Sequence, residues 1–140
     1  ALLAEAADRA GTEPIASSGK ILSGVPPEQA LETVFRAYLS KTHIDAVEIG
    51  CPVAALGSEM PRQAPKVRRA ATRGIKEMVD LIARQSPDWG QSGAHEQALV
   101  TVATLVGTLI LARAVDDAGF SDTLVKATLA HLVPASTADA

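Results

Sequence analysis

The sequence predicts an all-α protein built as a bundle of about five to six helices. Only 3% of the residues are aromatic, and runs of Val, Thr and Ile with a period of two are missing, so strands have little support. Apolar residues instead recur at helical spacing along most of the chain. With 140 residues, of which 47% are hydrophobic and 21% charged, the chain suits one domain with a single core.

Charge and cysteine content exclude several classes of protein. Thirteen basic against sixteen acidic residues give a net charge of -3, which argues against nucleic-acid binding over the whole surface. Cys51 is the single cysteine, so an intrachain disulfide framework and a multi-cysteine zinc site are excluded. The three dispersed histidines do not favour a metal site either. We therefore expect a cytoplasmic domain with no metal and no cofactor.

The first half of the chain predicts a tail, a loop and one amphipathic helix. Residues 1–10 are amphipathic without a signal-peptide pattern and look like the end of a longer helix. Residues 11–26 are rich in Gly, Ser, Thr and Pro without a period, which predicts a loop. A helix is expected over residues 27–42, where Pro27 suits the first turn. Its apolar face consists of Leu31, Val34, Phe35, Tyr38 and Leu39.

Two further helices are expected before residue 90. A short one follows the break at residues 50–52 and ends near Pro61, and a longer one runs from residue 65 to 85. Pro87 ends the longer helix because proline disfavours the helical conformation of the preceding residue. Residues 89–93 are expected to form a linker, with Trp89 as a plug over the core.

The segment from residue 94 to 115 is apolar on almost every side. Its densest stretch, residues 98–112, is shorter than the roughly 20 residues of a membrane span. We expect Gly119 to end this helix and Ser121 to cap a last helix, with residues 134–140 frayed.

A helix that is apolar all round must be covered on all sides, and a second copy of the chain is the simplest cover. The last two helices of two subunits would then form an intersubunit four-helix bundle. The residues expected in this dimer interface are Ala103, Gly107, Ile110, Ala114, Leu124, Thr128 and Leu132.

Four segments in a fixed order carry a family resemblance. They are Tyr38-Leu39-Ser40, the run from Gly50 to Glu59, the run from Pro65 to Ala70, and the run from Val106 to Val115 followed by Ser121-Asp122. In order and spacing these segments resemble the C-terminal regulatory domain of TetR-family transcriptional regulators, over about residues 27–132.

The resemblance implies a homodimer whose all-helical domain, residues 27–133, binds a small-molecule effector. Such regulators read operator DNA with an N-terminal helix-turn-helix domain, which is absent from this chain. Residues 1–10 match only the tail of the helix that links the two domains. We expect a repressor with an apolar, uncharged effector and no contact with a membrane.

The candidate effector-binding residues are large, flexible or lightly polar side chains expected to point into the bundle. The same pattern would also fit an ordinary hydrophobic core. The candidates are Phe35, Tyr38, Leu39, Leu56, Met60, Ile75, Met78, Thr104 and Thr108.

Cys51 and His43 suggest an alternative, a small all-helical enzyme or a carrier for a hydrophobic ligand. A thiolate beside an imidazole is activated as a nucleophile. A third catalytic residue and an oxyanion site cannot be identified in the sequence, so we expect no enzyme.

Overall fold

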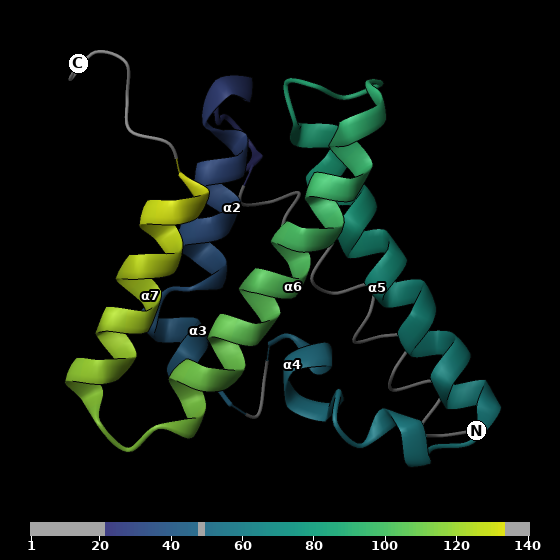
Figure 1. Ribbon diagram of the computed structural model, residues 1–140, viewed down its shortest axis with the longest axis vertical. Helices are drawn as coiled ribbons and strands as arrows, with labels where there is room; N and C mark the ends of the chain where they lie inside the picture. Colours follow the sequence, from purple (N-terminus) through teal and green to yellow (C-terminus); the bar gives the residue numbers. More distant parts are fainter. Residues whose placement is uncertain (1–21, 48–49, 134–140) are drawn as a thin grey trace.

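The computed structural model describes residues 22–47 and 50–133, and these residues are helical with no strand among them (Figure 1). The predicted all-α fold class is confirmed. The predicted linking tail at residues 1–10, most of the predicted loop and the predicted frayed end at 134–140 lie outside the described residues. The elements are η1 (Pro27–Gln29), α2 (Ala30–Tyr38), α3 (Lys41–Asp45), α4 (Pro52–Leu56), η2 (Met60–Arg62), α5 (Pro65–Gln85), α6 (Ser92–Ala114) and α7 (Ala118–Leu132).

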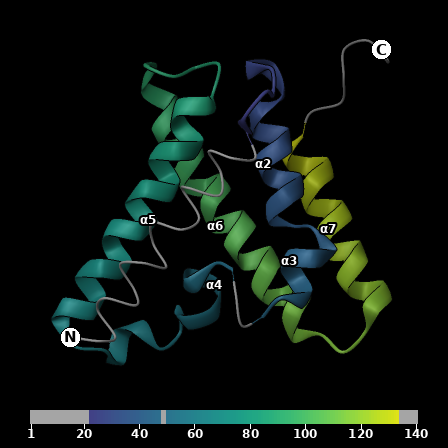
Figure 2. The same ribbon diagram turned by 180° about the vertical axis from the view of Figure 1, so that it is seen from behind.

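Helix α6 runs through the middle of the bundle, with α5 on one side and α7 on the other (Figure 1). The ends of α5 and α6 that are joined by the 86–91 turn lie together, and the two helices diverge toward their other ends. Helix α4 lies between those diverging ends, as the view from behind also shows (Figure 2). Helix α2 packs against α7 and α5 and closes the remaining side. The short helices therefore fill the space that the long ones leave.

The core sits around the buried face of α6. Leu105 and Leu109 are the largest fully buried side chains among the described residues, and both come from α6. They belong to one cluster with apolar residues of α2 and α5, and half-buried residues of α7 pack against it. The partners in that cluster include Phe35, Leu39, Val79, Ile82, Ala98 and Val102.

The helix predicted over residues 27–42 is divided in the structure. Helix α2 ends at Tyr38, and the Ser40 hydroxyl accepts a hydrogen bond from the backbone N–H of His43, which caps α3. A serine hydroxyl satisfies one of the N–H groups that have no partner at a helix start. Periodicity alone did not predict this break.

The prediction that Ser121 caps the last helix is wrong. The carboxylate of Asp117 accepts a hydrogen bond from the N–H of Phe120 and caps α7, while the hydroxyl of Ser121 donates to the carbonyl of Ala112 in α6. Gly119 does not end a helix, because it lies in the first turn of α7.

Two predictions about the turn before α6 also need correction. Trp89 is 55% exposed and does not plug the core. Helix α6 begins at Ser92, inside the predicted linker.

By length and composition, α6 could cross a membrane, with a mean hydropathy of 1.6 over its most apolar window. The core helix of a helical bundle has the same composition. In the structure α6 packs against both α5 and α7.

Leu109→Ala tests whether the buried face of α6 holds the bundle together. Removing a fully buried leucine side chain should lower the free energy of unfolding by about 2–5 kcal/mol, from lost transfer free energy and the cavity left behind. Urea denaturation measures the change. Leu56→Ala is the control, because Leu56 is 41% exposed and should cost clearly less. Equal losses in the two variants would contradict the assignment of the core to α6.

Candidate functional site

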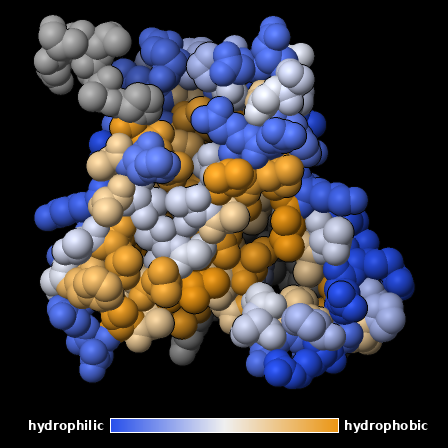
Figure 3. Space-filling view, viewed as in Figure 1, coloured by the Kyte–Doolittle hydropathy of each residue, from blue (hydrophilic) through white to orange (hydrophobic). Residues whose placement is uncertain are grey.

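The first candidate site is an apolar face of α6 that one subunit leaves uncovered. It lies opposite the buried face of the helix and consists of Leu99, Val100, Ala103, Ile110, Leu111 and Ala114, all exposed. We call it the outer face of α6. Figure 3 shows hydrophobic side chains gathered along α6 and onto the neighbouring part of α7. Val100 is 66% exposed and Leu111 52%, so large side chains as well as small ones meet solvent.

The interface residues predicted on α6 share this outer face. Ala103, Ile110 and Ala114 are exposed, and Gly107 is half-buried. A Cβ atom added at Gly107 would meet no heavy atom within 4 Å. The side of α6 at Gly107 is therefore open in the single subunit.

The interface residues predicted on α7 also make contacts inside the subunit. The hydroxyls of Thr128 and Thr108 are hydrogen bonded at 2.9 Å. Leu132 packs against the subunit's own core, and Leu124 is half-buried. Phe120, which is 50% exposed in the first turn of α7, was not predicted, because it does not belong to a periodic apolar pattern.

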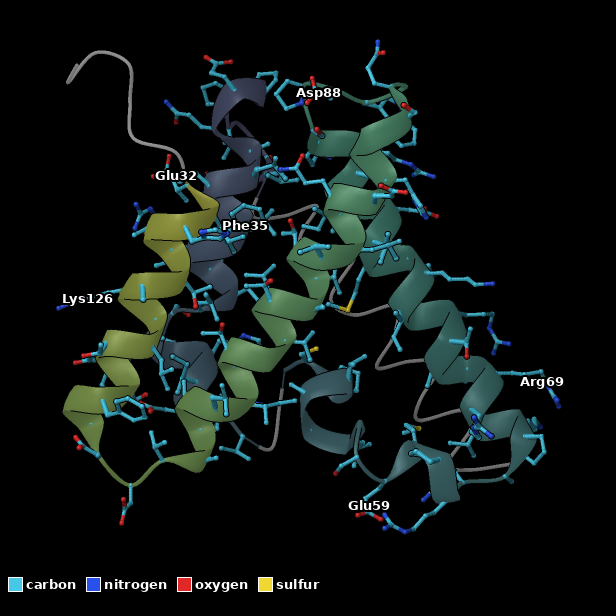
Figure 4. All side chains as sticks on the ribbon, viewed as in Figure 1. Glu32, Phe35, Glu59, Arg69, Asp88 and Lys126 are labelled. Carbon is cyan, nitrogen blue, oxygen red and sulfur yellow. The ribbon has the colours of Figure 1, made fainter. Side chains whose placement is uncertain are left out.

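The candidate effector-binding residues separate into two groups. Phe35 and Leu39 are buried in the core cluster, and Tyr38 and Met78 pack against the same cluster. Figure 4 shows Phe35 among α2, α6 and α7, whereas Arg69 and Lys126 point away from the bundle. The structure therefore brings the candidates of α2 together with Met78 of α5.

The other candidates lie elsewhere. Leu56 and Ile75 are exposed, at 41% and 39%, and Met60 is half-buried. Thr104 donates to the carbonyl of Val100 in its own helix, and Thr108 faces α7 through its bond to Thr128.

Tyr38 is the most unusual of the grouped residues. Its hydroxyl oxygen is buried and has no hydrogen-bond partner. Burial raises the pKa of Tyr38 far above its usual value, and the nearby Cys51 thiol raises it further, whereas the Arg113 guanidinium lowers it. The thiol is thus close to the hydroxyl without making a hydrogen bond of acceptable geometry. Tyr38 remains a protonated hydroxyl with an unused donor.

His43 links the end of α2 to the start of α4. The backbone N–H of Cys51 donates to Nε2 of His43 at 3.2 Å, so Nδ1 carries the imidazole hydrogen and donates to the carbonyl of Tyr38. The imidazole also packs edge-on against the Tyr38 ring, with 4.9 Å between centroids. Both ring nitrogens are therefore occupied by backbone groups that a helix end would otherwise leave unpaired.

Arg113 fixes α3 to the last turn of α6. Its Nε donates to the carbonyl of Ile44 at 3.1 Å, and its Nη2 donates to the carbonyls of His43 at 2.7 Å and Ala46 at 3.3 Å. These carbonyls lie at the C-terminal end of α3, where a cation is favourable. The role of Arg113 was not predicted from the sequence, because the groups it bonds lie about 70 residues earlier in the chain.

The geometry does not support the alternative of a Cys51–His43 catalytic pair. Activation of a thiol requires an imidazole nitrogen within hydrogen-bond reach of sulfur. Nε2 of His43 instead accepts the backbone N–H of Cys51, and Nδ1 faces the carbonyl of Tyr38. In the described part of the chain, no group of three His, Cys, Asp or Glu residues is placed to hold a metal ion.

The described residues form an all-helical domain around a central apolar helix, as the resemblance seen in the sequence implies. Residues 27–123 match the family model described as "Transcriptional regulator LmrA/YxaF-like, C-terminal domain". The chain belongs to the TetR family of transcriptional regulators, of which it carries the C-terminal domain.

Two relatives from Mycobacterium tuberculosis are similar to the chain. They are the uncharacterized HTH-type transcriptional regulators Rv0196 of strain H37Rv and MT0206 of strain CDC 1551. Each is 35% identical over 120 residues, which cover 80% of this chain and 60% of the relative. The chain thus spans less than two thirds of the length of these relatives.

Gly50→Ala tests the link between His43 and α4. Gly50 has φ +121°, which non-glycine residues rarely adopt, and an added Cβ would clash with Nε2 of His43. The variant should lose about 1–3 kcal/mol of unfolding free energy from backbone strain and the lost hydrogen bond. Denaturant titration measures it.

Gly24→Ala is the matched control. Gly24 also has a positive φ, +78°, but nothing lies within 4 Å of the added Cβ. It should cost clearly less than Gly50→Ala. A similar loss of unfolding free energy in both variants would mean that the contact between the new Cβ at residue 50 and His43 has no effect on stability.

Proposed function

We propose that this chain is the effector-binding and dimerisation domain of a TetR-type repressor. The whole protein would read its operator with a helix-turn-helix domain outside this chain and act as a homodimer in the cytoplasm. Membership of the family supports the proposal, as do relatives named HTH-type transcriptional regulators. The hydrogen bonds of His43 also favour a regulatory function over a catalytic one, because backbone groups occupy both of its ring nitrogens.

The single observation that carries the proposal is the outer face of α6. An exposed contiguous apolar surface marks a site of association. The small residues Ala103, Gly107 and Ala114 let a second helix approach closely, while Leu99 and Ile110 supply apolar area to bury. Packing of α6 and α7 against their copies would form a four-helix bundle between subunits. This assignment needs no membrane to cover α6.

The mechanism follows from differential affinity for two arrangements of the dimer. An effector lowers operator affinity only to the extent that it prefers the arrangement that DNA disfavours. Phe35, Tyr38 and Met78 are the residues we place next to the effector, because Phe35 belongs to the core cluster and the other two pack against it. Leu39 completes this group, and Leu56, Met60, Ile75, Thr104 and Thr108 remain outside it.

Gly107→Leu tests the dimer interface. The subunit has room for the new side chain, because no heavy atom lies within 4 Å of the added Cβ. Overpacking in a tight helix contact costs about 1–3 kcal/mol, so the dimer dissociation constant should rise roughly 5- to 150-fold. Sedimentation equilibrium over a range of concentrations measures it.

Gly93→Leu provides the control, since Gly93 has equally open surroundings but lies in the first turn of the same helix, about four turns before Gly107 and before the first residue of the outer face. It should weaken the dimer far less than Gly107→Leu. A wild-type chain that stays monomeric at micromolar concentration, or an intact dimer in Gly107→Leu, would count against the interface.

DNA binding should require more than this chain. The whole regulator should shift a duplex that contains the promoter of its own gene, while the 140-residue chain should not shift it at the same concentration, because sequence is read by a helix in the major groove. An electrophoretic mobility assay compares the two. Sequence-specific binding by the chain alone would contradict the proposal that a separate helix-turn-helix domain reads the operator.

A further inference from the structure

The starting observation is the unpaired hydroxyl of Tyr38. Buried polar groups in proteins almost always have a hydrogen-bond partner, and an exception calls for an explanation. Within residues 22–47 and 50–133, the Tyr38 hydroxyl is the only fully buried side-chain oxygen or nitrogen without one. Such a donor is costly in the free domain, and a ligand that carries an acceptor would remove that cost.

The neighbouring polar groups already have partners inside the subunit. Both nitrogens of His43 are occupied by backbone groups, and Arg113 donates three hydrogen bonds to carbonyls of α3 and the residue after it. The thiol of Cys51 is a weak donor and a weak acceptor. The O–H of Tyr38 is therefore the buried donor that is left free for a ligand in this part of the core.

The electrostatic environment selects against a charged ligand. Burial disfavours the phenolate of Tyr38 strongly, and Arg113 only partly offsets this effect. A carboxylate placed against the hydroxyl would meet the same desolvation. An uncharged acceptor, such as a ketone or ester oxygen, avoids this desolvation cost and still accepts a hydrogen bond from the Tyr38 O–H.

The start of α4 lies beside the hydroxyl. Cys51, which is 3% exposed, precedes the first turn of this five-residue helix and lies near the hydroxyl. The start of α4 is held by the bond from Cys51 N–H to His43, next to Gly50, whose positive φ glycine adopts readily. A helix this short has little stability of its own, so α4 can move without unfolding α5 or α6.

We propose that the Tyr38 hydroxyl is the polar anchor of the effector site, for an uncharged and mainly apolar molecule with one hydrogen-bond acceptor. Displacement of Cys51 and α4 admits the ligand. The inference rests on the proposed effector-binding function and specifies its chemistry.

The experiment uses three naphthalene probes of similar size. They are 2-acetylnaphthalene, an uncharged acceptor; 2-ethylnaphthalene, which has no acceptor; and 2-naphthoate, an anion. Fluorescence titration of the wild-type chain should show that the ketone binds about tenfold more tightly than the other two, as one well-formed hydrogen bond provides. Tyr38→Phe should remove this preference and leave the affinity for 2-ethylnaphthalene within about twofold.

A stability measurement separates this role from a purely structural one. Tyr38→Phe should not destabilise the free chain and should raise its Tm by about 2–6 °C, because it removes an unpaired buried hydroxyl. Cys51→Ala is the matched control, since it removes the adjacent thiol and keeps the anchor, and it should retain tight binding of the ketone.

Three results would overturn the inference: no binding of the ketone up to its solubility, equal binding of ketone and hydrocarbon, or an unchanged preference in Tyr38→Phe. The proposed dimer is tested separately by sedimentation. A dimeric chain that does not bind the ketone would reject the Tyr38 anchor alone.

Discussion

The structure depends on one helix that is apolar round its whole circumference. A helix of this kind has to be covered on every side in water, and the rest of the subunit covers only one face of α6. Leu105 and Leu109 are enclosed by the other helices, while Val100 and Leu111 remain exposed. The helix that forms the core is thus also the helix proposed for the interface. Because α6 moves as a rigid body, repacking on its inner face also shifts its outer face.

Polar groups at the helix ends impose the second constraint. Helices α3 and α4 have five residues each and would not form alone. They are held because His43 and Arg113 bond backbone groups that their ends leave unpaired. Among the described residues, the Tyr38 hydroxyl is the one fully buried side-chain oxygen or nitrogen that is left without a partner.

Periodic patterns predicted the features that depend on local sequence, which are the positions and faces of the long helices. The features that they did not predict depend on contacts between distant residues. The spacing of apolar residues was enough to place α5 and α6 and to assign Ala103 and Ile110 to one face. It could not decide between Asp117 and Ser121 as the cap of α7, because both residue types cap helices and Ser121 bonds Ala112 instead. The bonds of Arg113 to α3 and of Thr108 to Thr128 join positions far apart in the chain, for which the sequence carries no local signal. Among the effector candidates, periodicity identified apolar faces but not which faces meet.

The last turn of α6 joins the two sites through consecutive residues. Arg113 bonds the carbonyls at the end of α3, and Ala114 next to it is exposed on the outer face. His43, whose carbonyl Arg113 holds, is the residue that ties Tyr38 to Cys51. A ligand that displaces Cys51 would break the bond to His43, alter the end of α3 and so change the constraint on Arg113. Packed helices exchange between discrete arrangements rather than deforming continuously. In the proposed dimer, a change in the last turn of α6 would therefore alter the orientation of the partner subunit. If that orientation sets the spacing of the DNA-reading domains in the proposed repressor, these residues form a physical route from effector to operator.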